Sequence, residues 1–459
     1  MNSLIVVSIL ALVVLYLGLF KAKNALLPVS VLGLVAALVL AVCEWNSGAA
    51  PIFSGMMHFD NFAVAFTSLT VVSTILILLL SKQYFEKISE NVAEYYTIIL
   101  FALAGIIIMV SYHNLSMLFV GLEIMSVSLY ILAGIKKRDF ASNEASLKYF
   151  LMGAFSTGFL LFGIALLYGA SHSFDLSVIA KYVTDHPEGL NPIFYAGIVL
   201  IMVGMCFKVG AAPFHFWVPD VYEGSPTLIT TFMATVVKTA GFAAFLRLFS
   251  ICFAPLSDFW MPTLLAITII TLFIGNITAL FQDNFKRMLT YSSVSHAGYM
   301  LFAIVALGAT SSNAIFVYTA AYSLASIIAF AVLILVKEQT GSENFDSFNG
   351  LGKKNPFLAL VVTVSMLSFA GIPLTAGFIG KFFMFSSALQ EYHIWLVVLA
   401  IINAIISIFY YFRVIVAMYF KDAERKELVS NGYFKLVLGA SAIITVVLGV
   451  YPSLITDLF

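Results

Sequence analysis

Runs of about 20 apolar residues recur along this chain from Leu4 to Val450, and about fourteen of them can be counted. A helix needs roughly that many residues to cross the hydrocarbon core of a bilayer. Because lipid offers no hydrogen bonds, each run must satisfy its own backbone N–H and C=O groups, as a helix does. The sequence therefore predicts an all-α integral membrane protein with about fourteen transmembrane helices, forming a single polytopic membrane domain over residues 1–459.

The composition supports this prediction, since 62% of the residues are hydrophobic and only 10% are charged. Soluble domains are about a quarter charged. The 23 basic and 23 acidic side chains balance, so the net charge does not indicate a nucleic-acid partner. Cys43, Cys206 and Cys252 are too widely spaced for a disulfide framework or a metal site. Phosphate-binding glycine loops and nucleophile motifs are missing too, so we expect no metal and no cofactor in this chain.

Basic residues gather in alternate predicted loops, those after spans 1, 3, 5, 9, 11 and 13. Such loops face the cytoplasm in most membrane proteins. The opposite loops hold only Lys181. The pattern predicts that both termini lie on the non-cytoplasmic side. The basic residues in the predicted cytoplasmic loops are Lys21, Lys23, Lys82, Lys87, Lys136, Lys137, Arg138, Lys148, Lys286, Arg287, Lys337, Lys353, Lys354, Lys421, Arg425, Lys426 and Lys435.

Two apolar runs are interrupted by glycine and proline, at Gly210 to Pro213 in span 7 and at Gly371 to Pro373 in span 12. Proline leaves a helix carbonyl without its donor, so both spans are predicted to be broken helices. Five spans separate the interruptions, and an odd offset means that the two segments enter the membrane from opposite sides. This is the arithmetic of an inverted repeat, although Gly and Pro are common enough in membrane helices for coincidence to explain it as well.

Four ionisable side chains fall well inside predicted spans, and they are Glu123, Lys208, Lys238 and Lys381. Charges inside a bilayer are costly and usually functional. Structural ion pairing is the alternative explanation, but one carboxylate cannot neutralise three lysines. Burial favours a neutral lysine and a nearby carboxylate favours a charged one, so a change at Glu123 would switch a lysine between holding and releasing a proton. The four residues therefore predict a route for protons.

Three other charged or titratable residues are less clear from the sequence. His296 lies in a serine-rich stretch, where a proton relay and a packing role are equally good interpretations. Arg247 and Arg413 lie near the ends of long spans, and we expect their flexible side chains to reach the headgroups.

Two segments, Asn114 to Glu123 and Phe207 to Pro226, carry a family resemblance that extends over nearly the whole chain. They resemble the antiporter-like membrane subunits of respiratory complex I. The Pro-Asp-Val-Tyr-Glu-Gly stretch from Pro219 to Gly224 is most similar to the N-type subunits.

The resemblance implies two inverted five-helix repeats, with spans 4–8 in residues 96–253 and spans 9–13 in residues 261–420. It implies that Glu123, Lys208, Lys238 and Lys381 carry protons, with His296 as a less secure match. It also implies that NADH, FMN, iron–sulfur clusters and quinone belong to partner subunits. The chain would be a non-redox translocase subunit in a bacterial cell (inner) membrane, beside M-type and L-type antiporter-like subunits and small membrane subunits.

Two other functions fit parts of the same pattern. A subunit of a multi-subunit sodium/proton antiporter would share the helix plan and similar charges. A structural membrane scaffold would need the buried charges only for assembly. Fold alone does not separate these functions, and the Val221 to Gly224 stretch favours complex I.

Overall fold

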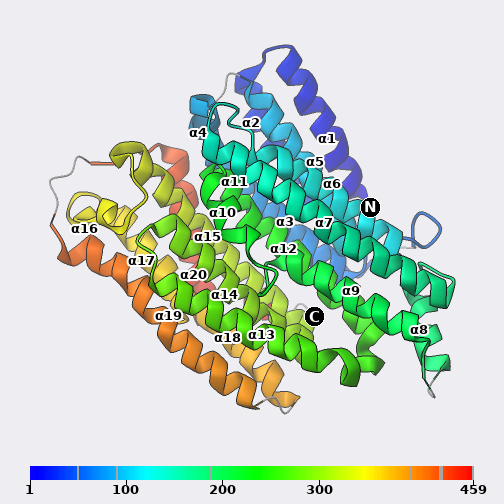
Figure 1. The fold of residues 1–459 in the computed structure, drawn as a ribbon. Helices are drawn as coiled ribbons and strands as arrows, with labels where there is room; N and C mark the ends of the chain where they lie inside the picture. Colours follow the sequence, from blue (N-terminus) through cyan, green and yellow to red (C-terminus); the bar gives the residue numbers. More distant parts are fainter. Residues whose placement is uncertain are drawn as a thin grey trace.

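The computed structural model describes residues 1–48, 51–88, 91–186, 189–391, 394–422, 427–428 and 430–456. These residues form a bundle of helices (Figure 1), and within them the only β-type pairing consists of isolated bridges. The prediction of an all-α membrane protein is confirmed. Arg425 and Lys426, which the orientation pattern includes, lie outside the described residues.

The N-terminal helices pack side by side along one edge of the bundle (Figure 1). The Asp60 carboxylate caps the third of them by accepting from the Ala63 N–H, which satisfies one of the donors at the helix start. These elements are α1 (Asn2–Leu19), α2 (Lys23–Cys43), α3 (Asn61–Leu79) and the short α4 (Ser81–Ile88).

The next five membrane passes run from α5 to η2, and the fourth of them is broken between α9 and α10. A short helix, α8, lies at one end of the bundle (Figure 1). These elements are α5 (Val92–Ser111), α6 (Leu115–Ala133), α7 (Phe140–Ser171), α8 (Leu176–Asp185), α9 (Pro192–Val209), α10 (Trp217–Gly224), α11 (Thr227–Phe232), η1 (Met233–Val237), α12 (Lys238–Leu248) and η2 (Phe249–Phe253).

A second set of five passes follows, and again the fourth is broken, now between α17 and α18. The short helix α16 lies at the end of the bundle opposite α8 (Figure 1). The elements are η3 (Ala254–Leu256), α13 (Ser257–Leu280), α14 (Phe285–Ala306), α15 (Ser311–Thr340), η4 (Phe345–Phe348), α16 (Leu351–Lys354), α17 (Pro356–Ala370), α18 (Ala376–Gln390) and α19 (Ile394–Phe420), after which α20 (Gly432–Val450) and α21 (Ser453–Thr456) end the chain.

Eleven helices in the described residues are long and apolar enough to cross a membrane. The longest, Thr227–Leu280, has 54 residues. This stretch is a run of consecutive elements, in which the short η3 joins the pass from α11 to η2 to the pass formed by α13, so it counts as two passes. With this helix counted twice, and with α14 and the broken pair α17/α18 added, the bundle has fourteen passes, as predicted.

The two sets of passes share a backbone pattern. In each set, the start of the second helix exchanges two hydrogen bonds with the segment after the third helix, and Asn114 or Asn284 caps that second helix with its side chain. The two bridges sit beside α8 and beside η4, at opposite ends of the bundle, as an inverted repeat requires. The bonds run from Leu115 N to Phe174 O (2.8 Å), Leu176 N to His113 O (3.0 Å), Phe285 N to Glu343 O (2.8 Å) and Phe345 N to Asp283 O (3.2 Å).

Both predicted helix breaks are present. α9 and α17 each end at a glycine in the left-handed region, Gly210 with φ of +74° and Gly371 with φ of +79°, a conformation that only glycine adopts without strain. The prediction of broken helices at spans 7 and 12 is confirmed, while the exact repeat limits, 96–253 and 261–420, remain a prediction.

Candidate functional site

The predicted site residues lie on five helices in the interior of the bundle. Lys208 (α9), Lys238 (α12) and Lys381 (α18) are at most 9% exposed, and His296 (α14) is buried as well. Glu123 (α6) is partly buried, and one of its carboxylate oxygens is enclosed without a hydrogen-bond partner. All five residues therefore lie within membrane passes and not at the ends of the bundle. Lys208 and Lys381 lie near the helix breaks, which interrupt their passes midway.

Lys208 and Glu123 are not joined by an ion pair in the described part of the chain. The Lys208 ammonium donates to the Ser126 hydroxyl at 2.7 Å, and Ser126 lies one turn after Glu123 on α6. The ammonium is also 6.0 Å from the centre of the Tyr130 ring. Glu123 therefore acts on Lys208 only through space. A change in the carboxylate's charge or position would alter how well the buried ammonium is stabilised.

Lys238 connects the first five passes to the second five. Its ammonium donates to the backbone carbonyl of Ser293 at 2.6 Å and to the Ser293 hydroxyl at 2.5 Å, both on α14. The five residues before it form the π-helix η1, a distortion that is often found at functional sites. Gly241 of α12 lies beside Val209 of α9, since a Cβ added at Gly241 would come within 3.3 Å of the Val209 side chain. In the described residues Lys208 bonds to Ser126 and Lys238 to Ser293, so the two lysines share no hydrogen-bond partner.

His296 continues the polar path along α14. Its Nδ1 lies 2.7 Å from the Tyr318 hydroxyl and its Nε2 lies 3.0 Å from the Tyr411 hydroxyl. The Tyr411 hydroxyl is also hydrogen-bonded to Ser292. Since each ring nitrogen contacts a hydroxyl, a proton can enter the imidazole on one side and leave on the other.

Lys381 bends back over the second helix break. Its ammonium donates to the carbonyls of Phe369 (3.0 Å) and Ala370 (2.9 Å), the last two residues of α17. Carbonyls at a helix end have no partner within the helix, so the lysine supplies the missing donors. A small cavity of about 10 Å³ lies between Lys381, His296 and Tyr322. This is about the space that one water molecule needs, so it can join the two titratable groups.

The sequence predicted a loop position for Lys286, and this is wrong, while the side of the membrane on which it lies stays a prediction. α14 begins at Phe285, and Lys286 is 1% exposed. Its ammonium donates to the carbonyls of Glu223 (2.8 Å) and Ser225 (2.7 Å). The signal for its position was Asn284, a helix-capping residue type directly before the apolar run.

The prediction that Arg247 reaches the headgroups is also wrong, because its side chain is 4% exposed. Its guanidinium pairs with Asp60 at 2.5 Å and lies 4.8 Å from the centre of the Phe62 ring. Asp60 comes from the start of α3, 187 residues away in sequence, so the pairing depends on the tertiary fold.

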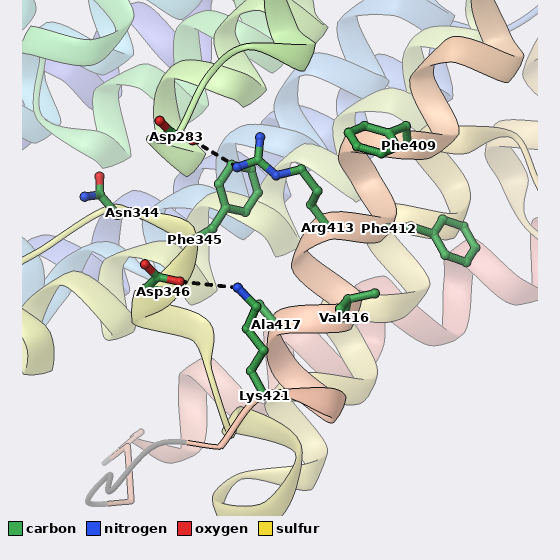
Figure 2. Close-up of a pocket in the computed structure, with 10 residues that line it drawn as sticks. All are labelled: Asp283, Asn344, Phe345, Asp346, Phe409, Phe412, Arg413, Val416, Ala417 and Lys421. Atoms are coloured by element: carbon green, nitrogen blue, oxygen red, sulfur yellow. Dashed lines mark hydrogen bonds and ion pairs between the residues drawn. The ribbon is translucent and has the colours of Figure 1, made fainter.

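Arg413 does reach the end of the bundle. Figure 2 shows its guanidinium beside the Phe345 ring and paired with Asp283 at 3.0 Å, and Lys421 pairs with Asp346. These residues line an open cavity of about 530 Å³. Its charged groups pair with one another, and it shares no lining residue with the cavity at Lys381, so it does not extend the row of buried lysines.

The described residues contain no group of three or more His, Cys, Asp or Glu side chains that could hold a metal ion. Cys43, Cys206 and Cys252 are all free thiols. The polar groups that meet in the interior are lysine, histidine, tyrosine and serine side chains, which can form hydrogen bonds and exchange protons.

Comparisons with known proteins agree with this geometry. Residues 111–407 match the family model described as NADH:quinone oxidoreductase/Mrp antiporter, transmembrane. NADH-quinone oxidoreductase subunit N of Trichlorobacter lovleyi is 43% identical, covering 98% of this chain and 94% of the relative. The corresponding protein of Cytophaga hutchinsonii is 39% identical, covering 100% and 99%.

A solved structure of respiratory complex I from Thermus thermophilus contains a chain with the same fold. It superposes with a TM-score of 0.85 at 32% identity and covers 99% of this chain and 98% of that one. Full-length similarity to the named relatives, together with the family-model match, shows that this chain belongs to the NADH-quinone oxidoreductase subunit N family, within the wider family of antiporter-like membrane subunits.

Proposed function

We propose that this chain is a proton-translocating membrane subunit of a complex I-type NADH:quinone oxidoreductase. The observation that carries the proposal is the row of buried lysines, Lys208, Lys238 and Lys381, none of which forms an ion pair in the described residues. Unpaired buried ammonium groups are costly to keep. If these lysines served structure alone, well-packed apolar side chains in their places would be equally or more stabilising.

In the proposed mechanism, Glu123 controls Lys208. When a charge change along the membrane arm moves or neutralises Glu123, the ammonium of Lys208 loses its through-space stabilisation and gives up a proton. The proton passes to Lys238, and from there along α14 through His296 and its tyrosine hydroxyls to Lys381. Lys208 and Lys238 share no hydrogen-bond partner in the described residues, so in this proposal water carries the proton between them.

The redox chemistry belongs to partner subunits in this proposal. NADH, FMN, iron–sulfur clusters and quinone would bind there, and this chain would be a non-redox part of the translocase. Its neighbours would be M-type and L-type antiporter-like subunits and small membrane subunits of a bacterial cell membrane. The alternating basic loops support an orientation with both termini on the non-cytoplasmic side.

The alternative function is that of a subunit in a sodium/proton antiporter, because the matching family model covers both kinds of protein. Affinity purification of the tagged full-length chain from its native membrane separates the two. The proposal predicts that NADH dehydrogenase activity purifies with the chain, and that protons move in vesicles only when NADH is oxidised. If the purified particle instead lacks NADH dehydrogenase and exchanges sodium for protons, the proposal is wrong.

A further inference from the structure

The half of span 7 that follows the break, α10, is tied to a helix of the second five passes. Lys286 lies in the first turn of α14 and is almost fully buried. Its ammonium donates to the Glu223 carbonyl at 2.8 Å and to the Ser225 carbonyl at 2.7 Å, at the C-terminal end of α10. Carbonyls at a helix end lack partners within the helix and favour a cation. Lys286 therefore supplies the C-terminal cap of α10 from a different repeat.

Side chains on the same two helices reinforce this connection. Arg287, next to Lys286, pairs with the Glu223 carboxylate and lies 3.8 Å from the Asp220 carboxylate. Asp220 also accepts from Lys148 of α7 at 2.7 Å. We call the contact formed by Asp220, Glu223, Ser225, Lys286 and Arg287 the α10–α14 junction.

α14 carries the next groups of the proposed proton route. Ser293, which accepts both hydrogen bonds from Lys238, lies seven residues after Lys286, and His296 lies ten residues after it. These separations correspond to about 10 and 15 Å along a helix. The α14 helix is buried over nearly its whole length, so a displacement of its first turn is transmitted to both residues.

We propose that Lys286 is a positioning residue that couples the span 7 break to Lys238 and His296 through the α10–α14 junction. The inference rests on the proposed proton-pumping function. Because Lys208 donates to Ser126 and Lys238 donates to Ser293, the two lysines share no hydrogen-bond partner in the described residues, and a signal from Lys208 must reach Lys238 by another route. A shift of α10 when Lys208 changes its charge moves α14 through Lys286, and the hydrogen bonds from Lys238 to Ser293 change with it.

The test uses the intact complex in membrane vesicles and compares Lys286→Met with Lys286→Arg, which keeps a cation and its donors. Lys137→Met is the matched control, because Lys137 is an exposed lysine outside the junction. For each variant, NADH oxidation by an artificial acceptor measures assembly, and the ratio of protons moved to NADH oxidised by quinone measures coupling. We expect the ratio of Lys286→Met to fall to the value of Lys208→Met, while Lys286→Arg and Lys137→Met keep the wild-type ratio.

A wild-type ratio in an assembled Lys286→Met complex would overturn the inference and leave Lys286 a structural cap. If Lys286→Met does not assemble, Arg287→Met takes its place, since it removes only the partly exposed ion pairs of the junction. A lowered ratio in that variant supports the coupling, and a wild-type ratio contradicts it. Lys208→Met keeps the two proposals separate, because a wild-type ratio in that variant contradicts the pumping function itself.

The double variant Lys208→Met/Lys286→Met adds an independent readout. Residues that act through one mechanism show non-additive effects. We expect the double variant to have the same ratio as Lys208→Met alone. Independent, additive losses would contradict a shared route through the junction.

Discussion

The breaks in spans 7 and 12 look alike in sequence, but their lysines are used differently. In span 7, Lys208 precedes the break and donates to a side chain on a neighbouring helix, Ser126. The Phe207 carbonyl there accepts from the Gly210 N–H at 3.1 Å and from the Trp217 indole at 3.0 Å. In span 12, Lys381 follows the break and donates to the carbonyls of α17 itself.

Because of this difference, loss of a proton from Lys208 and loss of a proton from Lys381 have different effects on the helix breaks. Lys208 can release its proton while the helix end stays capped by the indole. Lys381 cannot release its proton without weakening the hydrogen bonds that hold the end of α17. The protonation of Lys208 therefore depends mainly on the charge of Glu123, whereas the protonation of Lys381 is linked to the conformation of the second break.

The largest expected difference is in stability, between Lys381→Met and Lys208→Met. Both substitutions remove a buried charge, so the difference between them reports the hydrogen bonds. Lys381→Met leaves two buried carbonyls without a donor, at about 1–3 kcal/mol each, whereas Lys208→Met frees one serine hydroxyl. We expect a lower thermal denaturation temperature for the complex with Lys381→Met. Equal temperatures for both variants would remove the distinction between the breaks.

Alanine at the two break glycines should affect function unequally. Both Gly210 and Gly371 have positive φ, so either substitution costs about 1–2 kcal/mol in backbone strain. An added Cβ at Gly371 would lie 2.7 Å from Cδ of Lys381, while at Gly210 it would meet Val218. We expect Gly371→Ala to lower proton pumping per NADH and Gly210→Ala mainly to lower stability. Equal losses of pumping would contradict the comparison.

Trp217→Phe tests the first break in isolation. The substitution removes the indole donor to Phe207 and retains an aromatic ring against Tyr149, which stacks at 4.7 Å. One lost hydrogen bond should lower the free energy of unfolding by about 0.5–1.5 kcal/mol. Thermal denaturation of the purified complex measures this loss. An unchanged denaturation temperature would show that the indole does not stabilise the end of α9.

The smallest expected effect concerns Glu343. Its carbonyl accepts from the Phe285 N–H in the second set of passes, as the Phe174 carbonyl accepts from the Leu115 N–H in the first. Burial alone would raise the pKa of the Glu343 carboxyl, but Lys286 and Lys337 outweigh this and hold the pKa below its ordinary value. A lowered folded-state pKa contributes stability above the unfolded-state pKa, and this contribution disappears as the pH falls through the folded-state value.

Glu343→Gln should therefore destabilise the protein at neutral pH by at most about 1 kcal/mol, since Lys337 is largely exposed. The difference from wild type should shrink as the pH falls through the lowered pKa of the Glu343 carboxyl, where the folded wild type takes up a proton. Thermal denaturation at several pH values measures it. A difference that grows toward acidic pH would contradict the sign of the shift.

Local signals account for what the sequence could predict. Apolar length identified the passes, and Gly210, Pro213, Gly371 and Pro373 marked both breaks, because helix geometry and proline chemistry act over a few residues. The placement of Lys208, Lys238 and Lys381 within spans followed from the same counting. The structure buries all three.

Partners far apart in sequence could not be predicted. Arg247 finds Asp60 across 187 residues, and Lys286 finds the end of α10 across 61 or more. Such contacts depend on which helix faces pack together, which hydropathy does not encode. Sequence reasoning counted Lys286 as a loop residue for the same reason, since a basic pair at a helix start looks like a loop until its partner carbonyls are known.

The central claim is that the buried lysines carry protons. The most direct measurement is the number of protons moved per NADH oxidised in vesicles with Lys208→Met in the assembled complex, at matched rates of electron transfer. We predict a lower ratio than wild type with NADH dehydrogenase content unchanged. An unchanged ratio at unchanged electron transfer would contradict the account, because Lys208 would then be dispensable for pumping.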